Sequence, residues 1–126
     1  KKSKFFKTLK KNKVISIVGI GNDGHYASIF PNSKNLNTLV DNEAPPNLYK
    51  VEKIGKPMVE RATVNLSTIL LSKKILLLIS SKKKMKILSK SFKDKNHPLH
   101  HLLKCAKKKL LVFDAQSFER IKFKIR

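Results

Sequence analysis

The sequence lacks the features of disulfide-stabilised and membrane-spanning proteins. Its 126 residues include one cysteine, Cys105, and no tryptophan, so no disulfide can form within the chain. The longest apolar candidate, residues 69–79, is interrupted by Ser72, Lys73 and Lys74, and it is too short to cross a bilayer. Residues 1–13 are basic and do not resemble a signal peptide. We therefore expect a cytoplasmic protein with a single domain, residues 1–126.

Acidic residues and arginine are scarce as well. The chain carries 29 lysines and arginines against 8 acidic residues, which gives a formal net charge of +21, and its arginines are Arg61, Arg120 and Arg126. Surfaces that read nucleic acids usually draw on arginine, because its guanidinium group forks onto phosphates and guanine edges. The lysines here are spread along the whole chain. This pattern favours a general residue bias over a nucleic-acid partner, although the charge would steer a small anionic substrate.

Three apolar segments predict buried strands of a parallel sheet. They are Val14–Ile20, Lys74–Ser80 and Leu110–Phe113, and the chain between them has room for helices. Such alternation is typical of crossover units, so we expect an α/β fold: a Rossmann-like parallel sheet with flanking helices.

Smaller elements are predicted between these strands. Residues 61–66 favour a short strand, and helices are expected over 68–72 after an N-terminal cap at Ser67, over 81–91 and over 99–105. Residues 32–57 are interpreted mostly as a loop, because Pro45 and Pro46 oppose regular structure.

The most informative segment follows the first predicted strand. Gly19-Ile20-Gly21-Asn22-Asp23-Gly24-His25 combines three glycines with a carboxylate and an imidazole. Parallel sheets bind ligands at the carboxyl ends of their strands, and a histidine beside an aspartate there is a candidate general base. Ser81–Lys84 occupies the corresponding place after the second strand, where a helix N-terminus offers amides to an anion. Without further information, an exposed histidine with no chemical role explains the first turn equally well.

The sequence Gly19–His25 resembles the signature shared by 6-phosphogluconolactonases and glucosamine-6-phosphate deaminases. The continuation Ala27-Ser28-Ile29-Phe30-Pro31 is similar to the lactonase version, Ala-Ser-Leu-Phe-Pro. Deaminases typically carry Ala-Phe-Asn-Glu-Pro there, with a glutamate that supports the catalytic histidine, and this chain has no acid at that place. Later segments resemble the family in the right order: Glu60–Thr63, residues 76–88 and Leu111–Asp114.

The resemblance implies a lactone hydrolase that converts 6-phosphogluconolactone to 6-phosphogluconate in the oxidative pentose phosphate pathway, without a cofactor or metal. His25 would activate water with the help of Asp23. Gly21 and Gly24 would let backbone amides approach the substrate. A glucosamine-6-phosphate deaminase is the alternative within the family, and a non-catalytic basic remnant or polyanion-binding module is the alternative of another class.

Two further residues match family positions and would hold the substrate's anionic groups. Lys84 corresponds to the family lysine, and it would bind the phosphate as a point charge; as one of three successive lysines, it is equally explained as part of a solvated run. Arg61 would reach the same anion, and an ion pair with Glu60 or Glu52 is the structural alternative.

Family members are considerably longer, and their N-terminal part supplies a glycine-rich phosphate loop and several strands. Nothing in this chain resembles that part, so the sequence looks like the C-terminal half of a larger domain. We expect these 126 residues to be inactive alone, or to need the missing N-terminal half or another subunit.

A group of potential metal ligands lies near the C-terminus. His97 and His101 are four residues apart, as are His101 and Cys105, which is a spacing that can chelate zinc on a helix. Pro98 interrupts the first turn, and neither a zincin glutamate nor a second cysteine accompanies the set, which also includes His100. We therefore expect no metal site, and we interpret Cys105 as a small buried apolar group.

Overall fold

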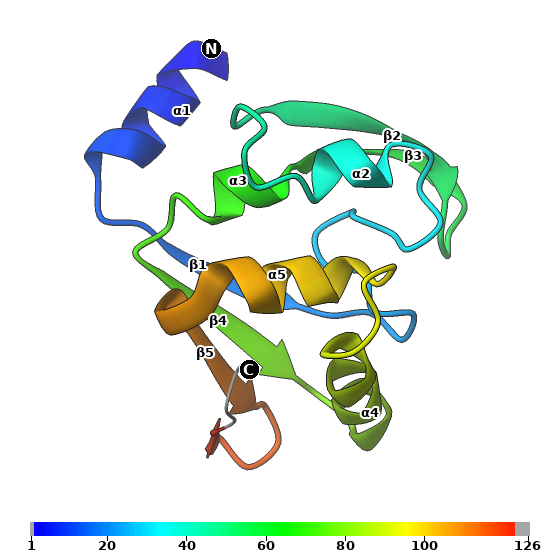
Figure 1. Ribbon diagram of the computed structural model, residues 1–126. Helices are drawn as coiled ribbons and strands as arrows, with labels where there is room; N and C mark the ends of the chain where they lie inside the picture. Colours follow the sequence, from blue (N-terminus) through cyan, green and yellow to red (C-terminus); the bar gives the residue numbers. More distant parts are fainter. Residues whose placement is uncertain (1, 123–126) are drawn as a thin grey trace.

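The computed structural model describes residues 2–122, and their elements form a mixed α/β fold (Figure 1). The main sheet contains β1 (Ile15–Gly19), β4 (Lys74–Ile79), β5 (Leu110–Asp114) and β6 (Arg120–Ile121), in the order β1-β4-β5-β6. The first three strands are parallel, and β6 is antiparallel to β5. The three predicted strands and the predicted fold class are therefore confirmed.

A separate antiparallel hairpin corrects the expectation for residues 32–57. It consists of β2 (Leu48–Ile54) and β3 (Val59–Val64), and the short helix α2 (Leu36–Leu39) precedes it. The loop interpretation was wrong for 48–54, because lysines between the apolar residues hide the alternation of a strand with one buried side. Val51 and Ile54 of this strand are buried, whereas Leu48 and Lys50 are exposed.

Helices connect these strands. They are α1 (Lys2–Lys11), α3 (Leu66–Ile69), α4 (Lys82–Ser91), α5 (Pro98–Ala106) and the 3-10 turn η1 (Lys107–Lys109). Ser81 caps α4 by accepting a hydrogen bond from the Lys84 amide, so the helix expected over 81–91 begins one residue later, at Lys82. The predicted cap at Ser67 is wrong: the Asn65 side chain accepts from the Thr68 amide, and the helix begins at Leu66.

The two faces of the main sheet differ in exposure. On one face, Val18, Leu77 and Val112 are buried together with the apolar side of α5, which lies across the sheet in Figure 1. The opposite side, here called the open face, carries side chains that are exposed or half-buried in the described part of the chain: Ile15, Ile17, Leu76, Leu78, Leu111 and Phe113. Ile17 is 69% exposed. A parallel sheet is normally buried on both faces, so this face is unusual in being apolar and open.

The strand register brings two turns next to one another. Gly19 of β1 pairs with Leu78 of β4, so residues 20–25 and residues 80–84 leave neighbouring strands at the same edge of the sheet. Within residues 2–122, none of the helices has the length and apolarity needed to span a bilayer.

Candidate active site

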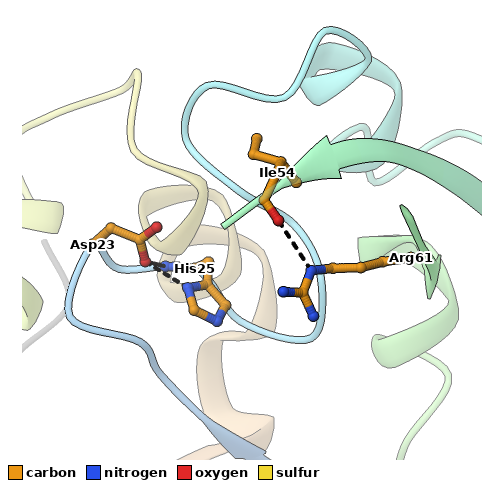
Figure 2. A network of polar contacts seen from close by, with 4 residues as sticks. All are labelled: Asp23, His25, Ile54 and Arg61. Carbon is orange, nitrogen blue, oxygen red and sulfur yellow. Dashed lines mark hydrogen bonds and ion pairs between the residues drawn. The ribbon is translucent and has the colours of Figure 1, made fainter. Parts of the chain in front are cut away.

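The turn after β1 folds back on itself and brings the Asp23 and His25 side chains together. The Gly21 amide donates to the His25 carbonyl at 2.8 Å, and the Gly24 amide donates to the Gly21 carbonyl at 3.0 Å. Gly24 has φ of +84°, a conformation that residues with a Cβ atom rarely adopt. These contacts place the Asp23 and His25 side chains on the same side of the turn (Figure 2).

Asp23 contacts both the backbone and the ring of His25. One carboxylate oxygen, Oδ1, lies 2.5 Å from His25 Nδ1 and also accepts from the His25 amide at 3.1 Å. Burial favours the neutral acid, but the hydrogen bonds from His25 outweigh it, so the pKa of Asp23 is lowered. Asp23 is therefore a carboxylate at neutral pH and can only accept. In a neutral imidazole the proton then sits on Nδ1, and Nε2 has a free lone pair.

The position of the His25 imidazole leaves no room for a side chain at residue 21. A Cβ atom placed on Gly21 would lie 2.1 Å from Cε1 and 2.2 Å from Nδ1 of His25. Both distances are far below van der Waals contact, so any side chain at position 21 would displace the ring. Gly19 differs, because a Cβ atom there would meet no atom within 4 Å.

The structure corrects the role predicted for the glycine amides. The Gly21 and Gly24 N–H groups both donate to backbone carbonyls of the turn, those of His25 and Gly21. They are therefore not free to bind a substrate oxygen or a developing oxyanion. The two glycines act through their shape instead. Gly21 makes room for the His25 ring, and Gly24 allows the turn to close.

Phe30 and Arg61 complete the surroundings of His25. The Phe30 ring stacks on the imidazole with centroids 4.3 Å apart, and the Arg61 guanidinium carbon lies 5.4 Å from the centroid of the same phenyl ring. Sequence reasoning used Phe30 only as part of the family motif and missed this contact, since a buried aromatic residue in an apolar run carries no signal of a site.

Arg61 is fixed by the hairpin loop. Its Nε donates to the Ile54 carbonyl at 3.3 Å (Figure 2), and its Nη2 donates to the Pro57 carbonyl at 2.7 Å. The structural alternative, an ion pair of Arg61 with Glu60 or Glu52, is not found among the described residues, because Glu60 pairs with Lys50 and Glu52 accepts from the Lys34 amide. The bonds to the two carbonyls use two of the five Arg61 N–H groups, and the guanidinium lies over the Phe30 ring that stacks on His25.

Lys84 lies on the neighbouring turn, at the start of α4. Its ammonium group donates to the Ser80 hydroxyl at 3.0 Å, and its backbone amide donates to the Ser81 hydroxyl. One of the helix amides expected for an anion is therefore already used. The lysine itself is directed back toward the end of β4, whereas Lys82 and Lys83 are exposed.

The histidines of α5 make separate contacts. His100 and His101 lie 2.8 Å and 2.9 Å from the carbonyls of Ser91 and Lys95, respectively. The described residues hold no group of three metal ligands. His97 instead contacts Gly24, which sequence spacing did not predict, because the two positions are far apart along the chain.

The arrangement can perform one kind of chemistry with its own side chains. An imidazole with a free Nε2, oriented by an ionised carboxylate through Nδ1, can take a proton from water or a hydroxyl group. Basic side chains on the hairpin and on the neighbouring turn supply positive charge for an anionic substrate.

Known proteins share this fold and, over part of their length, this sequence. A 6-phosphogluconolactonase from Neisseria meningitidis is 28% identical over 95 residues, which are 74% of this chain and 41% of that protein. A 6-phosphogluconolactonase structure from Thermotoga maritima is 25% identical with a TM-score of 0.64, and the match covers 89% of this chain and 49% of that one. A monomeric glucosamine-6-phosphate deaminase, 20% identical with a TM-score of 0.61, covers 92% of this chain and shows the same fold.

The chain thus spans about two fifths to one half of the length of these relatives. The family model described as glucosamine-6-phosphate isomerases/6-phosphogluconolactonase matches residues 4–112, and this range includes the Asp23–His25 turn, the hairpin and α4. The chain belongs to the glucosamine-6-phosphate isomerase/6-phosphogluconolactonase family.

Proposed function

We propose that the protein hydrolyses 6-phosphogluconolactone to 6-phosphogluconate, with His25 as the general base. The observation that carries the proposal is the 2.5 Å contact between Asp23 Oδ1 and His25 Nδ1. It fixes the tautomer that leaves Nε2 able to accept a proton. The names of the sequence relatives support the substrate.

The reaction needs only water and this pair of side chains. A water oxygen adds to the lactone carbonyl carbon while His25 Nε2 takes one of its protons. The bond between that carbon and the ring oxygen then breaks, and the proton passes from His25 to the departing oxygen. The products are a free hydroxyl group and a carboxylic acid that ionises in water. Asp23 stabilises the imidazolium that forms between the two steps.

The phosphate of the substrate would bind between the two turns. Lys84 supplies a point charge at the end of β4, and Arg61 has unused N–H groups beside Phe30. We propose Lys84 as the main phosphate ligand, because two of the Arg61 N–H groups are held by backbone carbonyls.

The lactonase assignment is favoured over deamination by the residues after His25. Ile29 and Phe30 are buried apolar side chains, and Phe30 packs on the imidazole. No acidic side chain follows His25 in this segment, so Asp23 alone orients the ring. A deaminase would release ammonia from glucosamine 6-phosphate, which a coupled assay detects.

We also propose that the open face is covered by the part of the family fold that the relatives carry beyond the matched region. The face is apolar, Ile15 is 61% and Ile17 69% exposed, and a parallel sheet is normally buried on both sides. The chain alone would then bind a hydrophobic dye and turn over slowly. Addition of the complementary portion would abolish dye binding and restore activity; normal turnover by a soluble monomer would contradict this.

The function is tested by following lactone loss above its spontaneous hydrolysis, with the chain alone and with the complementary portion. His25→Ala is the catalytic control, and His101→Ala is the matched histidine variant outside the turn. A rate of the parent protein no higher than spontaneous hydrolysis in both settings would refute lactone hydrolysis, and equal enzymatic rates for the parent protein and His25→Ala would refute His25 as the base. Tight, salt-dependent binding of nucleic acid by an inactive protein would instead support the polyanion-binding alternative.

A further inference from the structure

His97 occupies the N-cap position of α5 but does not cap the helix. Its backbone is extended, with φ of −86° and ψ of 128°, and its side chain makes no capping hydrogen bond. Residues preferred at this position are serine, threonine, aspartate and asparagine, which accept from the first amides of a helix. Helix capping therefore does not explain a histidine here, and its contacts lie elsewhere.

The imidazole of His97 packs directly on the catalytic turn. A Cβ atom placed on Gly24 would lie 1.8 Å from Cε1 and 2.3 Å from Nε2 of His97. The ring thus covers the space that a side chain at position 24 would occupy. Gly24 directly follows Asp23, the residue that contacts the His25 ring.

The other side of the same ring is held by α4. His97 Nδ1 lies 3.1 Å from the Ser91 hydroxyl, which is itself 2.7 Å from the Ile87 carbonyl. Ser91 is fully buried, and a buried hydroxyl is retained in one geometry by its partners. A continuous set of contacts therefore runs from α4 through Ser91 and His97 to Gly24, which lies between Asp23 and His25 in the turn.

We propose that His97 is a positioning residue, which holds the backbone of Asp23 and Gly24 so that the Asp23 carboxylate stays directed at His25. It does not touch the reacting atoms. The idea rests on the proposed function for its consequence in catalysis, but its geometry is independent of the substrate. Loss of the two ring nitrogens removes the bond to Ser91 that holds the ring on Gly24. This loss would loosen the Asp23–His25 hydrogen bond while leaving both partners in the chain.

The test is NMR of the full chain labelled with nitrogen-15 histidine, which observes the His25 Nδ1–H proton. His97→Phe keeps a ring over Gly24 and removes both nitrogens, and we expect exchange of this proton with water to become about tenfold faster, the loss of roughly one hydrogen bond. His101→Phe is the matched control on the same helix and should leave the exchange rate unchanged. Unchanged exchange in His97→Phe, or equal acceleration in His101→Phe, would overturn the proposal.

A second pair of variants decides the matter if His97→Phe does not fold. Ser91→Ala removes the α4 partner of His97, whereas Ser89→Ala removes an exposed hydroxyl that makes the same type of bond, to the Met85 carbonyl at 3.1 Å. We expect faster exchange of the His25 proton only in Ser91→Ala. The same exchange rate in both serine variants would reject a positioning role.

The NMR result and the enzymatic result separate the two proposals. Coupling between His97 and His25 without any lactone hydrolysis would leave the positioning role intact and refute the function. With hydrolysis established, His97→Phe should lower kcat about tenfold with little change in KM, because it acts on the base and not on the bound substrate. A rise in KM alone would contradict positioning.

Discussion

The turn after β1 and the turn after β4 leave the same edge of the sheet, but they are held in different ways. The first is closed by its own backbone hydrogen bonds and is covered by Phe30 and His97. The second presents three successive lysines, of which Lys84 alone reaches back to the sheet through Ser80. The first turn is thus built to fix one geometry, whereas the second offers charge on flexible side chains. The comparison suggests that chemistry depends on the first and substrate affinity on the second.

Removal of the base should give the largest effect. His25→Ala is expected to lower kcat by about 10²–10⁴-fold, the usual contribution of a positioned general base. His101→Ala should retain full activity, because His101 contacts the Lys95 carbonyl outside the turn. Circular dichroism of both variants checks that the fold is kept. A wild-type kcat in His25→Ala would show that the first turn does not supply the general base.

A methyl group in the first turn should be nearly as harmful. Gly21→Ala places Cβ against the His25 ring, and a displacement of about 1 Å can cost about 10²-fold in rate. Gly19→Ala is the matched control, since its Cβ would meet nothing within 4 Å. Steady-state kinetics of the two variants measure how strictly this turn must hold its shape. Similar losses of rate in both variants would show that the rate depends on the backbone of this segment and not on the position of the His25 ring.

The second turn should respond through binding. Lys84→Ala is expected to raise KM for the phosphorylated lactone about tenfold while changing kcat little, because a charge-assisted hydrogen bond to phosphate is lost. Lys83→Ala, an exposed neighbour, should behave as the parent protein does. If Lys84→Ala lowers kcat instead, then the second turn takes part in the chemistry and the distinction between the two turns disappears.

The smallest expected effect is on stability at mildly acidic pH. Burial lowers the pKa of His97 below its usual value of 6.5, although the Asp94 and Asp23 carboxylates oppose the shift. The unfolded chain then binds more protons than the folded one, so the free energy of unfolding falls as the pH drops below 6.5. Urea unfolding at about pH 7.5 and about pH 5.5 should show a smaller difference in His97→Phe than in the parent protein. An equal difference would show that a group other than His97 titrates.

The first turn could be predicted from the sequence, whereas much of its support could not. The apolar run before Gly21 and the glycines after it indicate a strand that ends in a tight turn, and the Asp23 and His25 side chains meet in that turn. The hairpin strand over 48–54 was hidden by its interspersed lysines. His97 was missed because its contact with Gly24 depends on how α5 packs on the sheet, and spacing along the chain does not report this.

Arg61 shows a further limit of reading residue types alone. Its position in the family motif favoured a substrate ligand, and its charge favoured an ion pair with a nearby glutamate. Two of its five N–H groups go to the Ile54 and Pro57 carbonyls and none to a glutamate within the described residues, because a hairpin loop leaves backbone carbonyls without partners and a guanidinium group satisfies two at once.

The open face of the sheet has a consequence for how this polypeptide behaves in solution. An exposed apolar sheet with a free edge at β1 is a template for self-association. A net charge of +21 opposes that association through mutual repulsion between copies. The lysine excess thus acts as a colloidal stabiliser, and added salt that screens it should turn a dispersed chain into an aggregating one before any loss of secondary structure.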